Sequence, residues 1–396
     1  MSKAKVPSIR FCGSDNAWEQ RKAKELFNTT VDKGYPELPV LSATQDRGMI
    51  RRDENSINIF HNKKNESGYK RVLPGQFVIH LRSFQGGFAH STIEGITSPA
   101  YTIFGFSEPE KHDSEYWKYV FTSKEFIRRL ETVTYGIRDG RSISYDEFLT
   151  LDFVYPSKAE QTAIARYFDK LSDLITLHQQ KYEKLQSLKS SMLEKMFPKD
   201  GADMPEVRFK GFCGLWEKMS ASELFISYVD KGHPELPVLS ATQDAGMVIR
   251  NEIGKRVFHE TANEVGYKRV LPGQFVIHLR SFQGGFAHST LEGITSPAYT
   301  VFGFKEPENH DDYFWKYVFI SKQFIKRLET VTYGIRDGRS ISYEEFLTLD
   351  FLFPSKKEQT RISTYLFQLD SLIAIRKQEM EKLQNIKKAL LEKMFI

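Results

Sequence analysis

The feature that most restricts the fold of this chain is an internal repeat. Trp18 and Trp216 are one of many identical pairs at a constant offset of 198 positions, which is half of the 396 residues. The same eleven residues, YGIRDGRSISY, occupy positions 135–145 and 333–343. A repeat of this length, uninterrupted by insertions, indicates two copies of one domain rather than a solenoid of short units.

The two copies differ mainly in one stretch. From Gly68 the chain reads GYKRVLPGQFVIHLRSFQGGFAHSTIEGITSPAYTIFGF, and it repeats this run from Gly266 with only two conservative changes. Divergence is concentrated in residues 47–67 against 245–265. Neither of the two cysteines recurs in the other copy, so neither belongs to a repeated disulfide or metal site.

Each copy begins with a segment of mixed character. Residues 1–157 are interrupted by Pro, Gly, Ser and Asn into short pieces. In GQFVIHLRS, Phe77 and Ile79 fall on one side of a strand and Val78 falls on the other. The stretch 116–130 has helical spacing instead. We therefore predict a mixed α/β globular domain in each copy.

A long helix is predicted after each globule. Residues 157–197 contain no Pro or Gly, and their apolar side chains recur at spacings of three and four, which is typical of a coiled-coil seam. The stretch after Pro354 has the same register. At 1.5 Å per residue, such a helix spans roughly 55 to 60 Å. We assign the seam to Leu171, Ile175, Tyr182, Leu185, Leu369, Ile373, Met380 and Leu383.

The two long helices are expected to pack on each other, because each apolar stripe needs a partner and the other copy has the only similar one. About a dozen residues join the first helix to the second globule, and they stretch at most roughly 40 Å. The second globule then begins near the far end of the first helix, which makes the pair antiparallel. The alternative is that each stripe is buried in a separate core. The predicted organisation is a globular domain in 1–157, a long helix and linker in 158–207, a second globular domain in 208–355 and a second long helix in 356–396.

The composition limits the class of protein. With 40% hydrophobic and 13% aromatic residues, the chain is expected to fold into globular domains. Lys and Arg number 56 against 51 Asp and Glu, an excess that permits a polyanionic partner without requiring one. The first residues lack the apolar core of a signal peptide, and no stretch approaches the roughly 18 apolar residues of a membrane span. We expect a cytoplasmic protein without a membrane partner.

The sequence contains no catalytic motif that both copies share. It has no Gly-rich phosphate loop, no Cys or His pair at metal-ligand spacing, no nucleophile elbow and no Asn-Pro-Pro-Tyr-like motif of an amino-methyltransferase. Glu108, Glu110 and Lys111 would suit a nuclease, but Asn309 replaces the lysine in the second copy. We predict no catalytic, cofactor-binding or metal-binding residues in this chain.

Two segments of each copy carry polar and basic residues on turns. RSFQGGFAHS, residues 82–91, follows a strand, and YGIRDGRSIS begins at position 135. Arg and Gln can read guanine and adenine edges, and Gly lets the backbone approach a phosphate closely. Ordinary surface turns have a similar composition. The candidate DNA-binding residues are Arg82, Ser83, Gln85, Gly86, Gly87, His90, Tyr135, Arg138, Arg141, Ser142, Arg280, Ser281, Gln283, Gly284, Gly285, His288, Tyr333, Arg336, Arg339 and Ser340.

The order of these motifs resembles the DNA-specificity subunit of type I restriction-modification systems over the full chain. A PSIRF or PEVRF start, a globule with PGQFVIHLRSFQGG and GITSPAY, and a helix ending in LEKMF all occur in both copies. The most specific element is a Pro-x-x-x-Glu-Gln run at the start of each long helix, with Pro156, Glu160 and Gln161 in the first copy. The resemblance implies that each globule reads one half of a bipartite DNA site. It also implies that the helices form an antiparallel spacer that docks two methyltransferase subunits.

The resemblance places the chemistry in the partner subunits. Nuclease or translocase subunits would join for cleavage, and S-adenosylmethionine, ATP and Mg²⁺ would act there and not in this chain. Members of the family generally carry two dissimilar recognition domains, whereas the two globules here are nearly identical. Two such globules related by a pseudo-two-fold axis present the same surface to an inverted sequence. We therefore predict a palindromic target whose half-sites flank an unread spacer.

Two other classes of protein stay open on the residues alone. An independent metal-dependent nuclease would need carboxylates clustered in both copies, and a non-DNA scaffold built on the helix pair would show no salt-sensitive binding to DNA. Within the divergent stretch, Arg47 corresponds to Ala245 and Arg51 corresponds to Ile249. We expect these positions to lie at the rim of the interface or to touch phosphate rather than bases.

Overall fold

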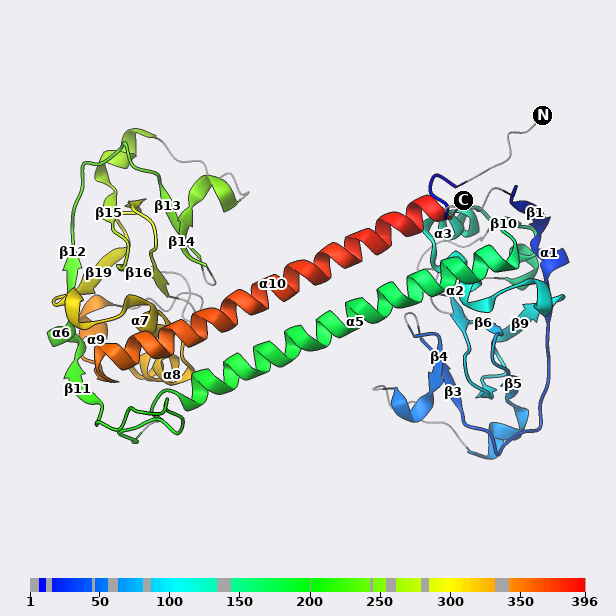
Figure 1. The fold of residues 1–396 in the computed structure, drawn as a ribbon, viewed down its shortest axis with the longest axis horizontal. Helices are drawn as coiled ribbons and strands as arrows, with labels where there is room; N and C mark the ends of the chain where they lie inside the picture. The colour runs from blue at the N-terminus through cyan, green and yellow to red at the C-terminus, as the bar shows by residue number, and fades with distance from the viewer. Residues whose placement is uncertain are drawn as a thin grey trace. The chain divides into compact units, whose positions relative to one another are not determined.

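In a computed structural model the chain forms two compact units (Figure 1). Unit 1 comprises residues 1–179 and 378–396, and unit 2 comprises residues 180–377. Each unit therefore contains one globule and a part of both long helices. The structure describes residues 7–11, 16–44, 47–55, 63–80, 87–133, 144–199, 201–242, 245–253, 261–278, 285–331 and 342–395.

The two copies of the repeat fold into the same elements in the same order. The first copy contains β1 (Glu19–Lys22), α1 (Ala23–Leu26), β2 (Phe27–Thr29), β3 (Leu41–Ala43), β4 (Met49–Arg51), β5 (Lys70–Val72), β6 (Phe77–Ile79), β7 (Phe88–His90), β8 (Gly95–Thr97), β9 (Thr102–Phe106), α2 (Ser114–Thr122), α3 (Lys124–Val133), α4 (Tyr145–Phe148), β10 (Asp152–Tyr155) and α5 (Lys158–Lys195). The second copy contains β11 (Glu217–Ser220), α6 (Ala221–Leu224), β12 (Phe225–Tyr228), β13 (Leu239–Thr242), β14 (Gly246–Ile249), β15 (Lys268–Val270), β16 (Phe275–Ile277), β17 (Phe286–His288), β18 (Gly293–Thr295), β19 (Thr300–Phe304), α7 (Asp312–Phe319), α8 (Lys322–Val331), α9 (Tyr343–Leu347), β20 (Asp350–Phe353) and α10 (Lys356–Met394).

The main sheet of each globule is antiparallel and has four strands, in the order β2-β9-β6-β7 in unit 1 and β12-β19-β16-β17 in unit 2. The alternation predicted for β6 is confirmed. Phe77 and Ile79 belong to a large aromatic core, while Val78 belongs to a smaller aliphatic core with Leu41 and Ile103. All three strand residues are buried, so the sheet lies between two cores and neither of its faces at β6 meets solvent.

The predicted helix across 116–130 is present but is broken once. Helix α2 ends at Thr122 and α3 begins at Lys124, because the intervening Ser123 has an extended backbone. Its Oγ accepts a hydrogen bond from the Phe126 N–H at 3.2 Å, which caps the start of α3. Serine competes with the helix backbone for hydrogen bonds, so the break follows from the sequence although the spacing of apolar residues did not reveal it.

Packed aromatic rings form the large core of each globule. In unit 1, Phe27 meets Trp117 edge to face at 5.3 Å, and Phe77 meets Phe121 in the same way at 4.9 Å. Such edge-to-face pairs add about 0.5 to 1.5 kcal/mol each to the burial of the rings. The high aromatic content of the chain is therefore explained by the cores of two small globules.

The long helices α5 and α10 lie side by side and run antiparallel (Figure 1). In unit 1 the first half of α5 meets the last turns of α10, where Lys387 Nζ donates to Ser172 Oγ at 2.8 Å. In unit 2 the last turns of α5 meet the first half of α10, where Lys189 and Asp370 form an ion pair of 2.5 Å. The predicted mixed α/β globules and antiparallel helix pair are thus confirmed. None of the described helices combines the length and the apolar character that a membrane crossing requires.

Candidate nucleic-acid interface

The Glu-Gln pair of the Pro-x-x-x-Glu-Gln run fixes the start of each long helix to its globule. In the first copy, Gln161 Nε2 donates to the Pro156 carbonyl and Gln161 Oε1 accepts from the Asp113 N–H, both at 2.9 Å. Glu160 accepts two hydrogen bonds from Arg10, at 2.7 and 3.0 Å. The second copy repeats all four contacts. No partner of this glutamate was predicted; the arginine that recurs in both copies, as Arg10 and Arg208, is the signal that could have identified the pair.

Most of the predicted DNA-binding residues lie outside the residues that the structure describes. These are Arg82, Ser83, Gln85, Gly86, Tyr135, Arg138, Arg141 and Ser142 in the first copy, and Arg280, Ser281, Gln283, Gly284, Tyr333, Arg336, Arg339 and Ser340 in the second. Gly87, His90, Gly285 and His288 are described. The roles of all twenty therefore stay predictions, but the structure shows what holds the two candidate segments.

Segment 81–86 joins the two strands of a β-hairpin. Strands β6 and β7 pair antiparallel, and the His80 N–H donates to the Gly87 carbonyl at 3.0 Å, which extends the ladder to the edge of the segment. Its counterpart is held in the same way, by a bond of 2.9 Å from the His278 N–H to the Gly285 carbonyl. Both ends of the segment are thus fixed by a paired sheet in each unit.

The second candidate segment, 134–143, is anchored on the same group of rings. Phe88 follows the hairpin segment directly and lies 5.1 Å from Phe126 of α3 and 5.3 Å from Phe148 of α4. Helix α3 precedes segment 134–143 and α4 follows it. Unit 2 repeats this arrangement around the phenylalanine that begins β17. The two candidate segments of each globule therefore start and end on elements that share one aromatic cluster.

The two histidines predicted to contact DNA lie inside the globules. His90 is buried beside Phe77, with its ring 3.8 Å from the Glu115 carboxylate, and burial lowers its pKa. His288 is equally buried, and its Nε2 lies 2.7 Å from Asp312 Oδ2. Side chains held in this way fit a structural role better than a contact with DNA.

The divergent stretch begins in the hairpin of β3 and β4, which contacts β7. Gly48 has a positive φ of 67°, and a Cβ placed there would lie 2.3 Å from the His90 carbonyl oxygen, so the turn between β3 and β4 rests directly on that strand. Arg47 and Arg51 are exposed on this hairpin. In the second copy the hairpin loses both cations, and Ile249 packs against the smaller core instead.

The eight predicted seam residues occupy the less exposed side of the long helices. Leu171 and Leu369 are buried, and the other six, Ile175, Tyr182, Leu185, Ile373, Met380 and Leu383, are half-buried while most of their neighbours are exposed. The two buried leucines belong to the part of each helix that packs on its own globule. Among the half-buried residues, Leu185 packs against the large core of unit 2, which includes Leu369 of α10.

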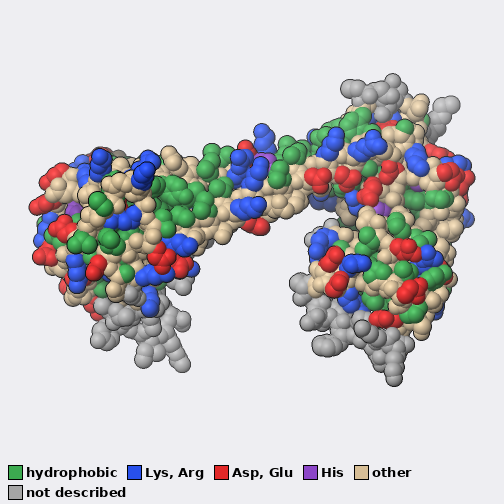
Figure 2. Space-filling view, turned by 60° about the horizontal axis from the view of Figure 1, so that its bottom comes forward, with side chains coloured by type: hydrophobic (Ala, Val, Ile, Leu, Met, Phe, Trp, Pro, Cys, Tyr) green, Lys and Arg blue, Asp and Glu red, His purple; other side chains and the backbone are tan. Residues whose placement is uncertain are grey.

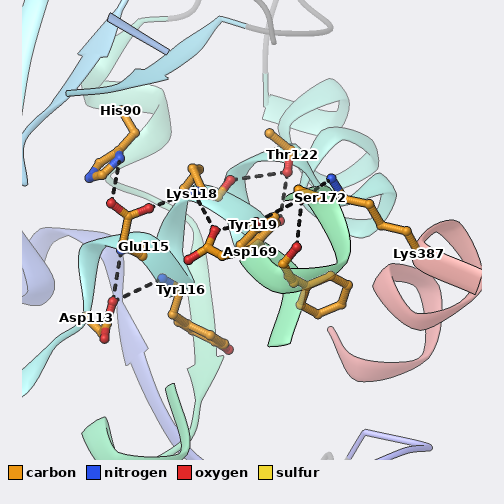
Figure 3. A network of polar contacts seen from close by, with 11 residues as sticks. His90, Asp113, Glu115, Tyr116, Lys118, Tyr119, Thr122, Asp169, Ser172 and Lys387 are labelled. Carbon is orange, nitrogen blue, oxygen red and sulfur yellow. Dashed lines mark hydrogen bonds and ion pairs between the residues drawn. The ribbon is translucent and has the colours of Figure 1, made fainter. Parts of the chain in front are cut away.

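A network of charged and hydroxyl groups ties α2 to the long helices in unit 1 (Figure 3). Lys118 Nζ lies 2.6 Å from Glu115 Oε2 and 3.1 Å from Asp169 Oδ1, and the Tyr119 hydroxyl donates to the same Asp169 oxygen at 2.7 Å. Burial raises the pKa of Tyr119 to about 12, and the carboxylate adds to this effect. This network was not predicted, because its members come from elements far apart along the chain.

The carboxylates considered for a nuclease do not form a metal site among the residues described. Glu108 is bound by Lys111 at 2.6 Å, and this bond lowers the pKa of Glu108. In the second copy, Asn309 donates to Glu306 at 2.8 Å. Within the described ranges, no three His, Cys, Asp or Glu residues are grouped as a metal ion would require.

Charges of both signs are interspersed over the globules on the face shown in Figure 2, while hydrophobic side chains gather along the long helices. The formal net charge of only +5 agrees with this mixture.

Sequence comparison identifies no relative of this chain: no protein-family profile matches it, and no curated protein matches it. Solved structures are nevertheless similar in fold. The S subunit of a type I restriction-modification system from M. genitalium matches with a TM-score of 0.56 and 14% identity over 99% of each chain. A chain from structural work on complex assembly and conformational transition of the type I restriction-modification system matches with a TM-score of 0.53 and 14% identity, over 96% of this chain and 97% of the other. The chain therefore has the fold of a type I specificity subunit.

Proposed function

We propose that this chain is the DNA-specificity subunit of a type I restriction-modification system. The observation that carries the proposal is the likeness in fold to an S subunit over 99% of both chains, which includes both globules and both long helices. In this function the chain catalyses nothing itself. It binds duplex DNA, and partner subunits supply the S-adenosylmethionine, ATP and Mg²⁺ chemistry.

The globules would read DNA through segments 81–86 and 134–143 and their counterparts in unit 2. Both segments extend from rigid elements around one aromatic cluster, and a rigid base is what precise base contacts require. Their arginines and glutamines supply bidentate donors, each worth about 1 to 3 kcal/mol of discrimination against a wrong base. Because the segments are identical in the two copies, the target would be an interrupted palindrome.

The long helices would dock two methyltransferase subunits. On the long helices, three apolar positions are exposed in both copies among the described residues, with exposed fractions between 38% and 49%. They are Leu174, Leu177 and Leu188 in α5, and Leu372, Ile375 and Ile386 in α10. Recurrence of the same exposed positions at the 198-residue offset is expected if one kind of partner docks twice.

The decisive experiment is a map of methylated adenines in cells that express this chain with its methyltransferase subunit. We expect one interrupted motif whose two halves are inverted copies. Two unrelated half-sites would contradict the palindrome and would move specificity into the divergent stretch 47–67. Absence of any new methylation would contradict the proposed function itself.

DNA binding by the purified complex tests the candidate segments. Replacing Arg138 and Arg336 together by alanine should weaken binding to all sequences and lower the salt dependence by about 0.9 per lost phosphate contact. Replacing Gln85 and Gln283 should instead change the preferred sequence. A matched control removes two exposed lysines elsewhere, at positions 111 and 199. Unchanged binding in both loop variants would remove these segments from the interface.

A further inference from the structure

The two copies are not equivalent where the long helix leaves the globule. Three positions of the charged network in unit 1 have different residues in unit 2. Glu115 corresponds to Tyr313, Asp169 to Phe367 and Ser172 to Asp370. The lysines of the network are kept, since Lys118 corresponds to Lys316 and Lys387 to Lys189.

In unit 1 the lysine that corresponds to Lys316 is bound by carboxylates. Lys118 is bound by two carboxylates, those of Glu115 and Asp169 (Figure 3). Burial lowers the pKa of Lys118, but the two carboxylates outweigh this effect and raise it overall. Lys387 reaches the Ser172 hydroxyl at 2.8 Å. Both carboxylates of the network thus bind Lys118, and Lys387 is bonded to a hydroxyl.

In unit 2 a single carboxylate, that of Asp370, acts on both lysines of the network, Lys189 and Lys316. Asp370 binds Lys189 at 2.5 Å and also accepts a hydrogen bond from the Tyr317 hydroxyl at 2.7 Å. Lys316 makes no hydrogen bond or ion pair with any residue that the structure describes, although it is half-buried between two rings. Its ammonium lies 5.9 Å from the Tyr313 ring centre and 5.8 Å from that of Tyr317. Burial lowers its pKa, which Asp370 only partly offsets.

An exposed apolar surface continues from the Tyr313 ring beside Lys316. Phe367 is 49% exposed and meets the Tyr313 ring edge to face at 5.8 Å. Leu372 and Ile375 continue the exposed apolar row along α10. Lys316 is thus a half-buried cation with no bonded carboxylate among the described residues, and the Tyr313 ring beside it contacts the exposed Phe367. Aromatic side chains are enriched at protein interfaces, and a ring face attracts a cation.

We propose that Lys316, together with Tyr313 and Phe367, receives an aspartate or glutamate side chain of the methyltransferase subunit docked along α10, so that unit 2 binds its copy more tightly than unit 1. The inference rests on the proposed function. Charge complementarity identifies a carboxylate as the missing group, because Glu115 and Asp169 supply it internally in unit 1. The exposed Phe367 and Ile375 favour a protein over DNA phosphates, which would leave the apolar side chains uncovered.

The test titrates the full chain with the methyltransferase subunit of the same system and follows the 1:1 and 1:2 complexes by native mass spectrometry and calorimetry. We expect two affinities that differ roughly tenfold or more, as one charge-assisted hydrogen bond would give. K316M should weaken only the tighter site, and K316R should retain it. The double variant Tyr313→Glu with Phe367→Asp rebuilds the internal carboxylates of unit 1, and should make the two sites nearly equal.

The outcomes separate the two proposals. If the wild-type chain binds no methyltransferase subunit, the proposed function fails. If it binds two subunits with equal affinity, or if K316M and the double variant leave both affinities unchanged while circular dichroism shows an intact fold, the inference about Lys316 is wrong and the proposed function stands. A loss of DNA affinity without any change in subunit binding would also overturn it, because the missing group would then be a phosphate.

Discussion

Replacing Glu358 by alanine should destabilise unit 2 by about 3 kcal/mol. Arg208 binds this carboxylate through two parallel hydrogen bonds of 2.6 and 2.8 Å, and the two side chains are only 13% and 3% exposed. Removal of one member of such a pair leaves a charge without its partner in the interior, which costs about 3 to 5 kcal/mol. We take the lower end, because Arg208 keeps its hydrogen bond to the Gly214 carbonyl at 2.8 Å.

Urea denaturation of the full chain measures this loss as a fall in the free energy of unfolding. Hydrogen exchange assigns it to a unit, since protection should fall at the start of α10 and not at the start of α5. The matched variant, Glu160→Ala, removes the equivalent carboxylate from Arg10 in unit 1 and should show the reverse pattern. This ion pair holds the start of the long helix on its globule. Both variants should therefore also allow methylation of targets whose half-sites are separated by a wider range of spacer lengths.

Two controls test the reasoning. Replacing the pair Arg208 and Glu358 by methionine and leucine should recover most of the lost stability, since apolar residues of similar volume can replace a buried ion pair at little cost. Glu206→Ala breaks the exposed pair with Lys199 and should have no measurable effect. A Glu358→Ala variant within about 1 kcal/mol of wild type would refute the assignment of a buried, stabilising pair at the helix start.

Three further predictions follow from other features. Proline at both Leu171 and Leu369 should break α5 and α10, at about 3 kcal/mol or more per helix, and native mass spectrometry should show release of the methyltransferase subunits. Gly246→Ala places a Cβ 2.3 Å from the His288 carbonyl oxygen at a φ of 72°, so thermal unfolding should show a lower Tm and hydrogen exchange should show an open β13–β14 hairpin. Burial raises the pKa of Tyr119 to about 12, so this group adds stability that is complete below about pH 10 and is lost as the pH rises to about 12. Urea denaturation over this range should show wild type losing stability relative to Tyr119→Phe, and parallel curves would contradict the shift.

Long-range regularities of the chain were predictable from the sequence. The repeat fixed the number of globules, and the absence of Pro and Gly after Ser157 placed the start of α5 within one residue of its observed position at Lys158. The antiparallel direction followed from the reach of a short linker. These conclusions depend on periodicity and chain length, which do not require knowledge of tertiary contacts.

Features that depend on a single polar group or on contacts between distant segments were not predictable from the apolar pattern. The break at Ser123 depends on one hydroxyl that caps a helix, and a pattern of apolar residues does not report it. The histidines at positions 90 and 288 are buried because β7 and β17, the sheet strands that carry them, are covered by α2 and α7. Lys316 lacks the carboxylate partners of Lys118 because two positions changed between copies, one three residues before it from Glu to Tyr and one 51 residues after it from Asp to Phe.

The order in which the two units can finish folding follows from the way their cores are completed. Phe395 lies 5.5 Å from Tyr116 and 5.8 Å from Phe168, so the core of unit 1 includes residues from the last turn of α10. The core of unit 2 uses Met196 and Phe197 in the same role, and every residue of that unit precedes position 378. Since a ribosome delivers the chain from its N-terminus, the globule that is synthesised first must wait for residues that emerge after the whole of the second. During translation, unit 2 can therefore reach its complete core before unit 1 does.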